Sequence, residues 1–174
     1  EKLGIVVTNS ITNYTWGPMR DLRVLRIVWL GAYQGRVGSV DVDRVRFADG
    51  AEAVREVVRH PGAVVIVPLL GDGRVLLERQ FRYPTGTELI ELPAGKLDPG
   101  EAPLACARRE LAEETGHVAT SWRLLASFYS APGFCDEVMH CFLAEGLAPD
   151  GAAGPDDDER LEVLAVPFTR SEST

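Results

Sequence analysis

The chain has 174 residues, of which 45% are hydrophobic and 25% are charged, and its formal net charge at pH 7 is −8. This composition is typical of one soluble globular domain, and the acidic balance without a basic stripe argues against long nucleic acid as a partner. The most apolar early stretch, residues 22–33, is interrupted by Arg23 and Arg26 and is too short to cross a bilayer. We therefore expect no membrane span.

The three cysteines are Cys106, Cys135 and Cys141, and no two of them have CxxC spacing. An odd number without that spacing indicates neither a disulfide framework nor a zinc site. A reducing compartment, the cytoplasm, is the simplest expectation.

The N-terminal third of the chain is expected to be extended. Strand-like segments fall at residues 3–7, 22–30, 38–47 and 51–59. The third of these alternates valines with charged residues, as a half-buried strand does, and Asp49-Gly50 after it marks a turn. Because these segments carry little apolar mass for a core of their own, residues 1–60 are expected to form an N-terminal strand region and 61–174 the main domain.

The middle of the chain begins with a continuous apolar run. Residues 63–70 are expected to form a strand covered on both faces, and residues 74–80 are expected to return as its hairpin partner after the turn Gly71-Asp72-Gly73. The two glycines could also suggest a phosphate loop, but no GxxxxGK[ST] motif follows, so the turn is favoured.

The pattern becomes helical over residues 102–115. Leu104, Ala107, Leu111 and Thr115 lie on one stripe, with Pro103 in the first turn and Gly116 just past the end. Further strands are expected at 122–129, 138–144 and 161–166. Several strands around one well-marked helix predict an α+β domain with a mixed sheet.

Three carboxylates crowd one part of this helix. Glu110, Glu113 and Glu114 have the three- and four-residue spacings that place side chains on one face. Like charges at that spacing, and anions in a last helical turn, destabilise a helix unless a cation offsets them. A divalent cation bound by these oxygens is one interpretation, and a solvated face with Arg–Glu pairs is the other.

The helix also lies inside a longer motif. Gly95, then five residues, Glu101, seven residues and Arg109-Glu110-Leu111-Ala112-Glu113-Glu114-Thr115-Gly116 resemble the Nudix box, except that His117 replaces the usual aliphatic residue. This resemblance implies a Nudix-type α/β/α sandwich and a site for Mg²⁺, with Mn²⁺ as an alternative. The implied ligands are the carbonyl of Ala94 and the carboxylates of Glu110, Glu113 and Glu114, while Arg109, Glu101 and Gly95 support them.

The flanks of the box suggest the substrate class. The segments 79–83, 91–95 and 130–137 are similar to the ADP-ribose pyrophosphatase branch, as is the position of Pro132, which lies 16 residues beyond Gly116. One departure is that Ala131 separates Ser130 from Pro132. GDP-mannose pyrophosphatases share much of this neighbourhood, so a nucleoside diphosphate sugar is indicated more firmly than ADP-ribose itself.

Several residues outside the box are candidates for substrate binding. Arg82 suits a diphosphate because a guanidinium can bind two phosphate oxygens, although an ordinary salt bridge at a strand end is an equal alternative. Glu137 could accept hydrogen bonds from ribose or base, with Pro132 and Gly133 beside it in the same loop. An aromatic face for a base could come from Trp16, Trp29, Tyr33 or Phe47, each of which is more typical of a core position.

The acidic run 156–159 occupies the place of the loop that carries the catalytic base in this branch. There the resemblance implies a base at Asp157 and a metal-associated carboxylate at Glu159, and a solvated charge run is the alternative. The branch also implies a homodimer that exchanges N-terminal strands. A non-catalytic Nudix module that senses a nucleotide sugar remains a different class of answer, although the acidic positions of the box are intact.

Overall fold

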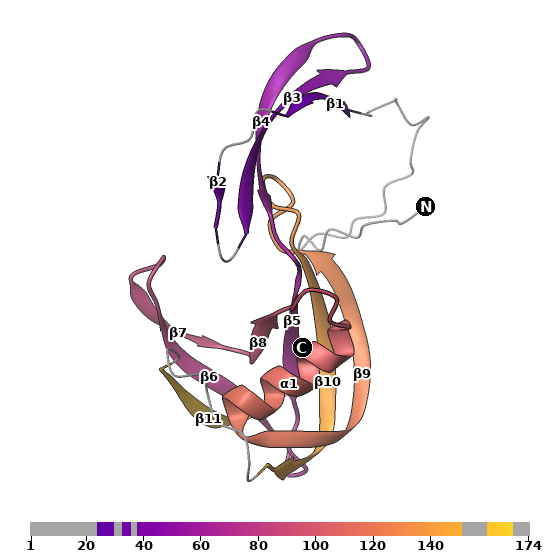
Figure 1. Ribbon diagram of the computed structural model, residues 1–174. Coiled ribbons are helices and arrows are strands. Elements are labelled where there is room, and N and C mark those ends of the chain that lie inside the picture. The colour runs from indigo at the N-terminus through magenta and orange to yellow at the C-terminus, as the bar shows by residue number, and fades with distance from the viewer. Residues whose placement is uncertain (1–23, 30–32, 36–37, 151–159, 169–174) are drawn as a thin grey trace, which may run out of the picture. The chain divides into compact units, whose positions relative to one another are not determined.

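A computed structural model of the chain describes residues 24–29, 33–35, 38–150 and 160–168 (Figure 1). In chain order the elements are the strands β1 (Val24–Trp29), β2 (Tyr33–Gln34), β3 (Ser39–Phe47), β4 (Glu52–Arg59), β5 (Ala63–Pro68), β6 (Arg74–Arg82), β7 (Thr87–Glu91) and β8 (Ala94–Lys96), the helix α1 (Pro103–Thr115), and the strands β9 (His117–Tyr129), β10 (Val138–Pro149) and β11 (Leu161–Pro167). The segment 3–7, expected to be extended, lies outside the described residues.

The chain divides into two compact units. The first unit comprises residues 1–61 and 128–138, and the second unit comprises residues 62–127 and 139–174. Among the described residues, no helix is both long enough and apolar enough to span a membrane.

The first unit is built on one antiparallel sheet. β3 pairs with β1, β2 and β4, and every one of these pairings is antiparallel. The turn expected at Asp49-Gly50 joins β3 to β4, where Gly50 has φ 88° and its N–H donates to the carbonyl of Phe47. A positive φ is the reason that glycine is suited to this position. The antiparallel N-terminal strand region is therefore confirmed over residues 39–59, and β1 confirms the strand expected within residues 22–30.

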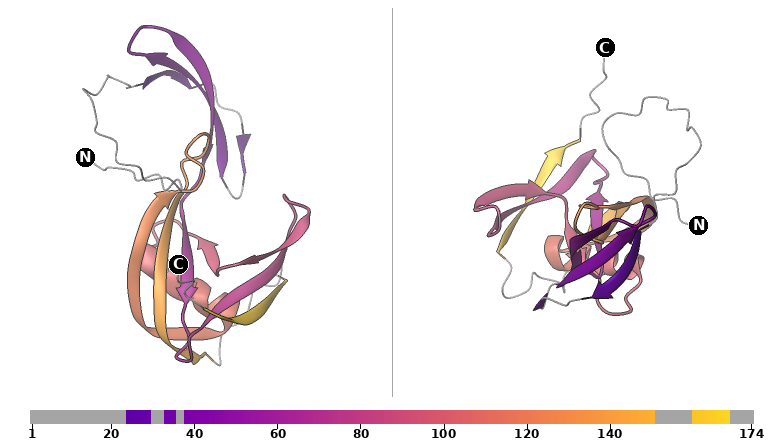
Figure 2. Two further views of the ribbon diagram at one scale, coloured as in Figure 1. Left: turned by 180° about the vertical axis from the view of Figure 1, so that it is seen from behind. Right: turned by 90° about the horizontal axis from the view of Figure 1, so that it is seen from above.

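The second unit contains a mixed sheet with the order β8-β5-β10-β9, seen from behind in Figure 2. β5 pairs in parallel with β10 and antiparallel with β8, so both edges of this apolar strand are occupied. The buried core lies between this sheet and α1 and is formed by Val64, Ile66, Leu97, Cys106, Ala107, Leu111, Phe142 and Ala144. The mixed sheet predicted from the strand pattern is confirmed.

A separate antiparallel sheet holds β11, β6 and β7 in that order. The sequence predicted instead that residues 74–80 return as the hairpin partner of β5, and that prediction is wrong. The turn forms, with the N–H of Gly73 donating to the carbonyl of Leu70, but only the bridge between Leu69 and Val75 joins the two strands. Because β8 and β10 already hold both edges of β5, β6 pairs elsewhere.

The helix α1 begins and ends where its sequence signals predict. Pro103 stands at its first position, and Gly116 adopts a left-handed conformation (φ 65°, ψ 27°) with its N–H donating to the carbonyl of Ala112. The expected stripe faces the core, because Ala107, Leu111 and Thr115 are buried and Leu104 packs against the core cluster. This anchoring fixes the direction in which the helix presents its carboxylates.

Candidate active site

The buried face of α1 carries two carboxylates as well as apolar side chains. Glu110 is 8% exposed and Glu114 is 7% exposed. The Glu114 Oε2 accepts a hydrogen bond from the backbone N–H of Ala94 at 3.0 Å, so this carboxylate lies at the start of β8. A buried carboxylate needs partners that compensate its lost hydration, and a purely structural helix has little reason to bury two of them.

Gly95 allows Glu110 to approach the backbone of β8. A Cβ atom built on Gly95 would lie 1.9 Å from both Cδ and Oε1 of Glu110, far inside van der Waals contact. Only glycine therefore fits this position while Glu110 keeps its place. The supporting role that the Nudix resemblance implied for Gly95 has a steric counterpart here.

Arg109 joins the remaining carboxylates of the motif. Its Nε and Nη2 bind the two oxygens of Glu101 at 3.1 Å and 2.9 Å, a bidentate pair. Its Nη1 lies 2.7 Å from Glu110 Oε1 and 3.0 Å from Glu113 Oε2. One guanidinium thus contacts three carboxylates. It links Glu101, which precedes the helix, to Glu110 and Glu113 on α1.

These contacts shift the acid–base properties of the cluster. The hydrogen bonds from Arg109 lower the pKa of Glu101 from 4.5 to about 2, and Glu101 in turn raises the pKa of Arg109. Burial raises the pKa of the Cys106 thiol to about 12, so this cysteine stays protonated near neutral pH. Cys106 is therefore packing material of the core rather than a nucleophile.

The donor set fits a hard divalent cation in its chemistry. Glu110 and Glu114 offer carboxylate oxygens beside the β8 backbone, and oxygen is the ligand that Mg²⁺ and Mn²⁺ prefer. Within the part of the chain that the structure describes, no three carboxylate, imidazole or thiol groups already converge as a cation site. In this structure the positive charge beside Glu110 and Glu113 is the guanidinium of Arg109. A bound metal ion would replace Arg109 as the partner of these two carboxylates.

Arg82, predicted to bind a diphosphate, lies at the end of β6. Its Nε donates to Glu91 Oε2 on β7 at 2.7 Å, and its side chain is 41% exposed. The salt bridge that was the alternative interpretation is therefore present. Because that bond uses Nε and a guanidinium has five N–H donors, it leaves Arg82 able to bind phosphate oxygens.

The other predicted substrate residues lie in the first unit, on the loop between β9 and β10. Residues 131–136 form this loop, and Ser130 and Glu137 meet at its neck, where the Ser130 N–H donates to the Glu137 carbonyl at 3.2 Å. Pro132 and Gly133 lie at the tip. The structure thus brings Pro132, Gly133 and Glu137 together on one short loop.

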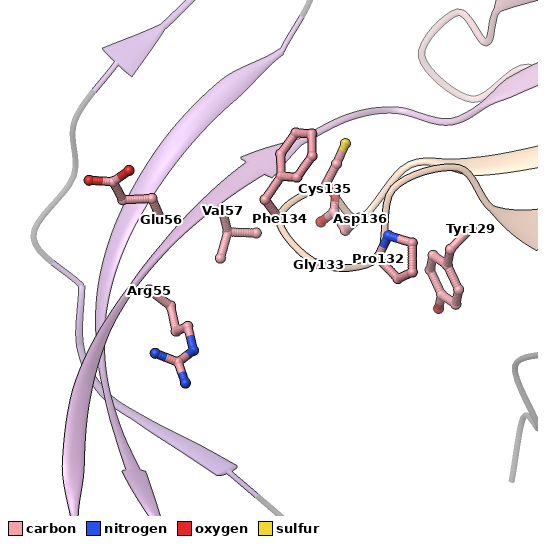
Figure 3. Close-up of a pocket in the computed structure, with 9 residues that line it drawn as sticks. All are labelled: Arg55, Glu56, Val57, Tyr129, Pro132, Gly133, Phe134, Cys135 and Asp136. Carbon is pink, nitrogen blue, oxygen red and sulfur yellow. The ribbon is translucent and has the colours of Figure 1, made fainter. Parts of the chain in front are cut away.

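A pocket of about 490 Å³ opens beside this loop in the first unit (Figure 3). It is lined by Arg55, Glu56, Val57, Tyr129, Pro132, Gly133, Phe134, Cys135 and Asp136. Its size is within the usual range for small-molecule pockets. Tyr129 and Phe134, with 43% and 60% of their surfaces exposed, supply aromatic faces that the sequence reasoning missed.

The missed aromatic residues had a signal in the sequence, since Phe134 lies inside the candidate segment 130–137 and Tyr129 directly precedes it. Of the aromatic residues named instead, Tyr33 and Phe47 do not line this pocket: Tyr33 is 66% exposed on β2, and Phe47 lies under the guanidinium of Arg55 at 5.5 Å. Asp157 and Glu159, predicted as base and metal-associated carboxylate, lie outside the described residues, and so does Trp16.

Comparison with known proteins decides the family. A model described as the NUDIX domain matches residues 58–171, which is more than half of the chain. The chain belongs to the Nudix family. The box at residues 95–116 lies inside this match, and the α+β fold with mixed sheets is the Nudix fold.

Relatives within the Nudix family are close in sequence. A methanol dehydrogenase activator of Bacillus methanolicus is 41% identical over 135 residues, covering 77% of this chain and 73% of that protein. An ADP-ribose pyrophosphatase of Bacillus subtilis is 39% identical over 149 residues, covering 85% of this chain and 80% of that protein. The crystal structure of an ADP compounds hydrolase matches with a TM-score of 0.74 and 26% identity, covering 86% of this chain and 81% of the other.

Proposed function

We propose that this Nudix protein hydrolyses the diphosphate bond of a nucleoside diphosphate sugar, with ADP-ribose as the preferred substrate and AMP and ribose 5-phosphate as products. The observation that carries the proposal is the pair of buried carboxylates, Glu110 and Glu114, held against β8 by Gly95 and Ala94. The similarity to the ADP-ribose pyrophosphatase of Bacillus subtilis supports the choice of substrate.

We assign the metal ligands to Ala94, Glu110, Glu113 and Glu114, and Mg²⁺ is the proposed ion. When bound, such an ion neutralises charge on phosphoryl oxygens and lowers the pKa of water. Arg109 and Glu101 hold the carboxylates of α1 in position before any ion is present. That arrangement limits the side-chain reorganisation that metal binding requires.

The remaining roles concern the substrate and the water. Arg82 holds the diphosphate through the N–H groups that its bond to Glu91 leaves available. Glu137, with Pro132 and Gly133 beside it, accepts hydrogen bonds from ribose or base hydroxyl and amino groups. Asp157 takes the proton of the attacking water, and Glu159 supports the metal site.

Assembly and location are part of the same proposal. We propose a homodimer in which the N-terminal strands are exchanged, supported by the exposed antiparallel sheet of the first unit. Light scattering would then give twice the chain mass of 19.0 kDa, and a monomer that is fully active would contradict the exchange. The cytoplasm is the proposed compartment because Cys106, Cys135 and Cys141 are all free.

The alternative substrates are GDP-mannose and other sugar nucleotides, because the flanking segments of the box do not separate these classes. The test is product analysis with Mg²⁺ and a panel of ADP-ribose, GDP-mannose, UDP-glucose, NADH and diadenosine polyphosphates. We expect AMP from ADP-ribose with the highest kcat/KM, and no product after chelation. Turnover of another panel member alone would replace ADP-ribose as the substrate.

Single-residue variants test the site itself. We expect Glu114→Gln to lower kcat at least about 100-fold with Mg²⁺ present, because a neutral amide is a poor ligand for a hard cation. Arg108→Gln, on the same helix, is the matched control and should stay within about twofold of the wild type. Full activity of Glu114→Gln would refute the metal assignment. Tight binding of ADP-ribose without turnover by the wild type would instead favour a non-catalytic sensor.

A further inference from the structure

We propose that His60 and Ser130 are positioning residues that hold the carboxylate of Glu137 for substrate binding. This inference rests on the proposed function, since Glu137 is there a substrate-binding residue. The observation is that both oxygens of one carboxylate have fixed partners in the first unit. Ser130 Oγ donates to Glu137 Oε2, and His60 Nδ1 lies 3.2 Å from Glu137 Oε1.

The two partners come from different parts of the chain. Ser130 follows β9 at the neck of the loop, whereas His60 directly follows β4. The His60 side chain is 13% exposed and the Glu137 side chain is 22% exposed. The pair is therefore largely shielded from water, yet Glu137 retains accessible surface through which it can meet a ligand.

The loop itself is fastened to β4 by backbone bonds. Val58 N–H donates to the Phe134 carbonyl at 2.7 Å, and Asp136 N–H donates to the Val58 carbonyl at 3.1 Å. The Asp136 carboxylate accepts a hydrogen bond from the backbone N–H of His60 at 2.8 Å and another from Arg59 Nη1 at 3.1 Å. The loop is therefore anchored by bonds that do not involve the Glu137 carboxylate, and the bonds from the Ser130 and His60 side chains act on that carboxylate directly.

The hydrogen-bonding capacity of a carboxylate explains how fixing Glu137 would favour substrate binding. Each carboxylate oxygen has two lone pairs, so an oxygen that accepts one hydrogen bond can accept a second. With one lone pair of each oxygen used by Ser130 and His60, each oxygen keeps a second lone pair that can accept a hydrogen bond from a ligand hydroxyl group. A side chain that is already ordered loses less entropy when it binds such a ligand.

The role predicts a specific kinetic signature. His60→Ala should raise KM for ADP-ribose about 10-fold and leave kcat within about twofold. The variant loses the hydrogen bond to the charged Glu137 carboxylate, which acts in substrate binding and not in the chemical step. Ser130→Ala should act in the same direction. His60→Asn should restore most of the affinity, because the Asn Nδ2 occupies the place of His Nδ1, whereas His60→Gln should not.

A double-mutant cycle tests whether His60 acts through Glu137. We would measure the Kd of the ADP-ribose analogue with a methylene group in place of the bridging oxygen, by calorimetry, in the wild type, His60→Ala, Glu137→Gln and the double variant. We expect the effect of His60→Ala to disappear in the Glu137→Gln background. His140→Ala is the control, because His140 binds Ser127 at 2.9 Å instead, so its effect should be equal in both backgrounds.

The outcomes separate this inference from the proposed function. Equal effects of His60→Ala in both backgrounds, or no effect at all, would overturn the positioning role while hydrolysis by the wild type stands. Binding of the analogue without hydrolysis of ADP-ribose would refute the hydrolase proposal, and the cycle in Kd would still decide the role of His60. A wild type that neither binds nor hydrolyses overturns both.

Discussion

Arg109 occupies the position of a counter-ion within the acidic motif. It contacts Glu101, Glu110 and Glu113 and also donates to the Lys96 carbonyl at 3.3 Å. Three carboxylates around one guanidinium leave a net negative charge, which is the electrostatic condition for attracting a divalent cation. Arg109 therefore neutralises the cluster only in part, and the charge that remains is what the proposed metal site requires.

Glu101 gives this cluster a pH dependence. Its pKa is about 2 in the folded protein against 4.5 ordinarily, so its contribution to stability is complete above about pH 4.5 and is lost as pH falls toward 2. We expect Glu101→Gln to lower the Tm at pH 7, and the difference from the wild type to shrink as pH approaches 2. Thermal melts of both metal-free proteins across that range measure it. A difference that is constant with pH would contradict this account.

Gly95 is a position where a single methyl group would disturb the candidate site directly. Gly95→Ala places a Cβ at 1.9 Å from Glu110 Cδ, so Glu110 must move away from β8. We expect a loss of about 1–3 kcal/mol in the free energy of unfolding, the usual cost of overpacking, together with a large loss of kcat.

The matched control for this variant is Gly71→Ala in the turn before β6. Nothing lies within 4 Å of a Cβ at Gly71, and its φ is not positive. It should change the free energy of unfolding by less than about 0.5 kcal/mol and leave kcat unchanged. Wild-type kcat in Gly95→Ala would show that the close approach of Glu110 is dispensable.

At the scale of elements, Arg59 connects β3 and β4 with the loop of residues 131–136. It binds Asp41 at 2.8 Å and Asp43 at 3.3 Å on β3, and Asp136 at 3.1 Å on the loop. Arg59→Met would leave the carboxylate of Asp43, which is 4% exposed, without this cation. We expect a loss of about 1–3 kcal/mol in urea unfolding, reduced from the fully buried case because Arg59 is itself 38% exposed.

The same sheet offers a control for the Arg59 prediction. Arg46 pairs with Glu52 at 2.7 Å, and both side chains are well exposed. Exposed pairs contribute little, so Arg46→Met should change the free energy of unfolding by less than about 0.5 kcal/mol. Faster hydrogen exchange at the Val58 and Asp136 amides in Arg59→Met, and not in Arg46→Met, would locate the effect in the loop. Unchanged exchange in both variants would count against the connection.

The elements also show what sequence patterns can predict. The helix over residues 103–115 was predictable because its stripe, its proline and its final glycine all agree. β8 and β7 were not predicted, since three to five residues beside a glycine and a proline give no clear periodicity. The pairing of β6 was predicted wrongly because chain neighbours usually pair, whereas here β10 reaches β5 from far along the chain.

In the candidate site, too, local features were predictable from the sequence and long-range contacts were not. The box residues could be named because they share one loop and one helix, where local spacing determines which side chains meet. The contacts of Glu137 with His60, and of Arg59 with Asp136, depend on long-range packing and carry no spacing signal. The pocket lining from β4 was missed for this reason.

At the scale of the whole molecule, we expect the fold not to depend on a metal ion. The core between α1 and the mixed sheet is apolar, and Arg109 already compensates the carboxylates that a metal ion would bind. We therefore expect chelation to abolish activity while the Tm falls by no more than a few degrees, and added Mg²⁺ to raise the Tm by mass action. Calorimetry with and without chelator measures this. Unfolding on chelation would mean that the metal is structural.

The parallel pairing of β5 with β10 has a further consequence for how the chain folds. Ala63 is matched with Met139 and Val64 with His140, and the entire box lies between these partners in the chain. During synthesis β5 emerges early as an apolar run, and its parallel neighbour β10 leaves the ribosome only after the helix has been made. Such non-local pairing closes a long loop and slows folding. The nascent chain therefore exposes one edge of this apolar strand until β10 has been made, and slower translation between residues 70 and 138 should lower the yield of folded enzyme.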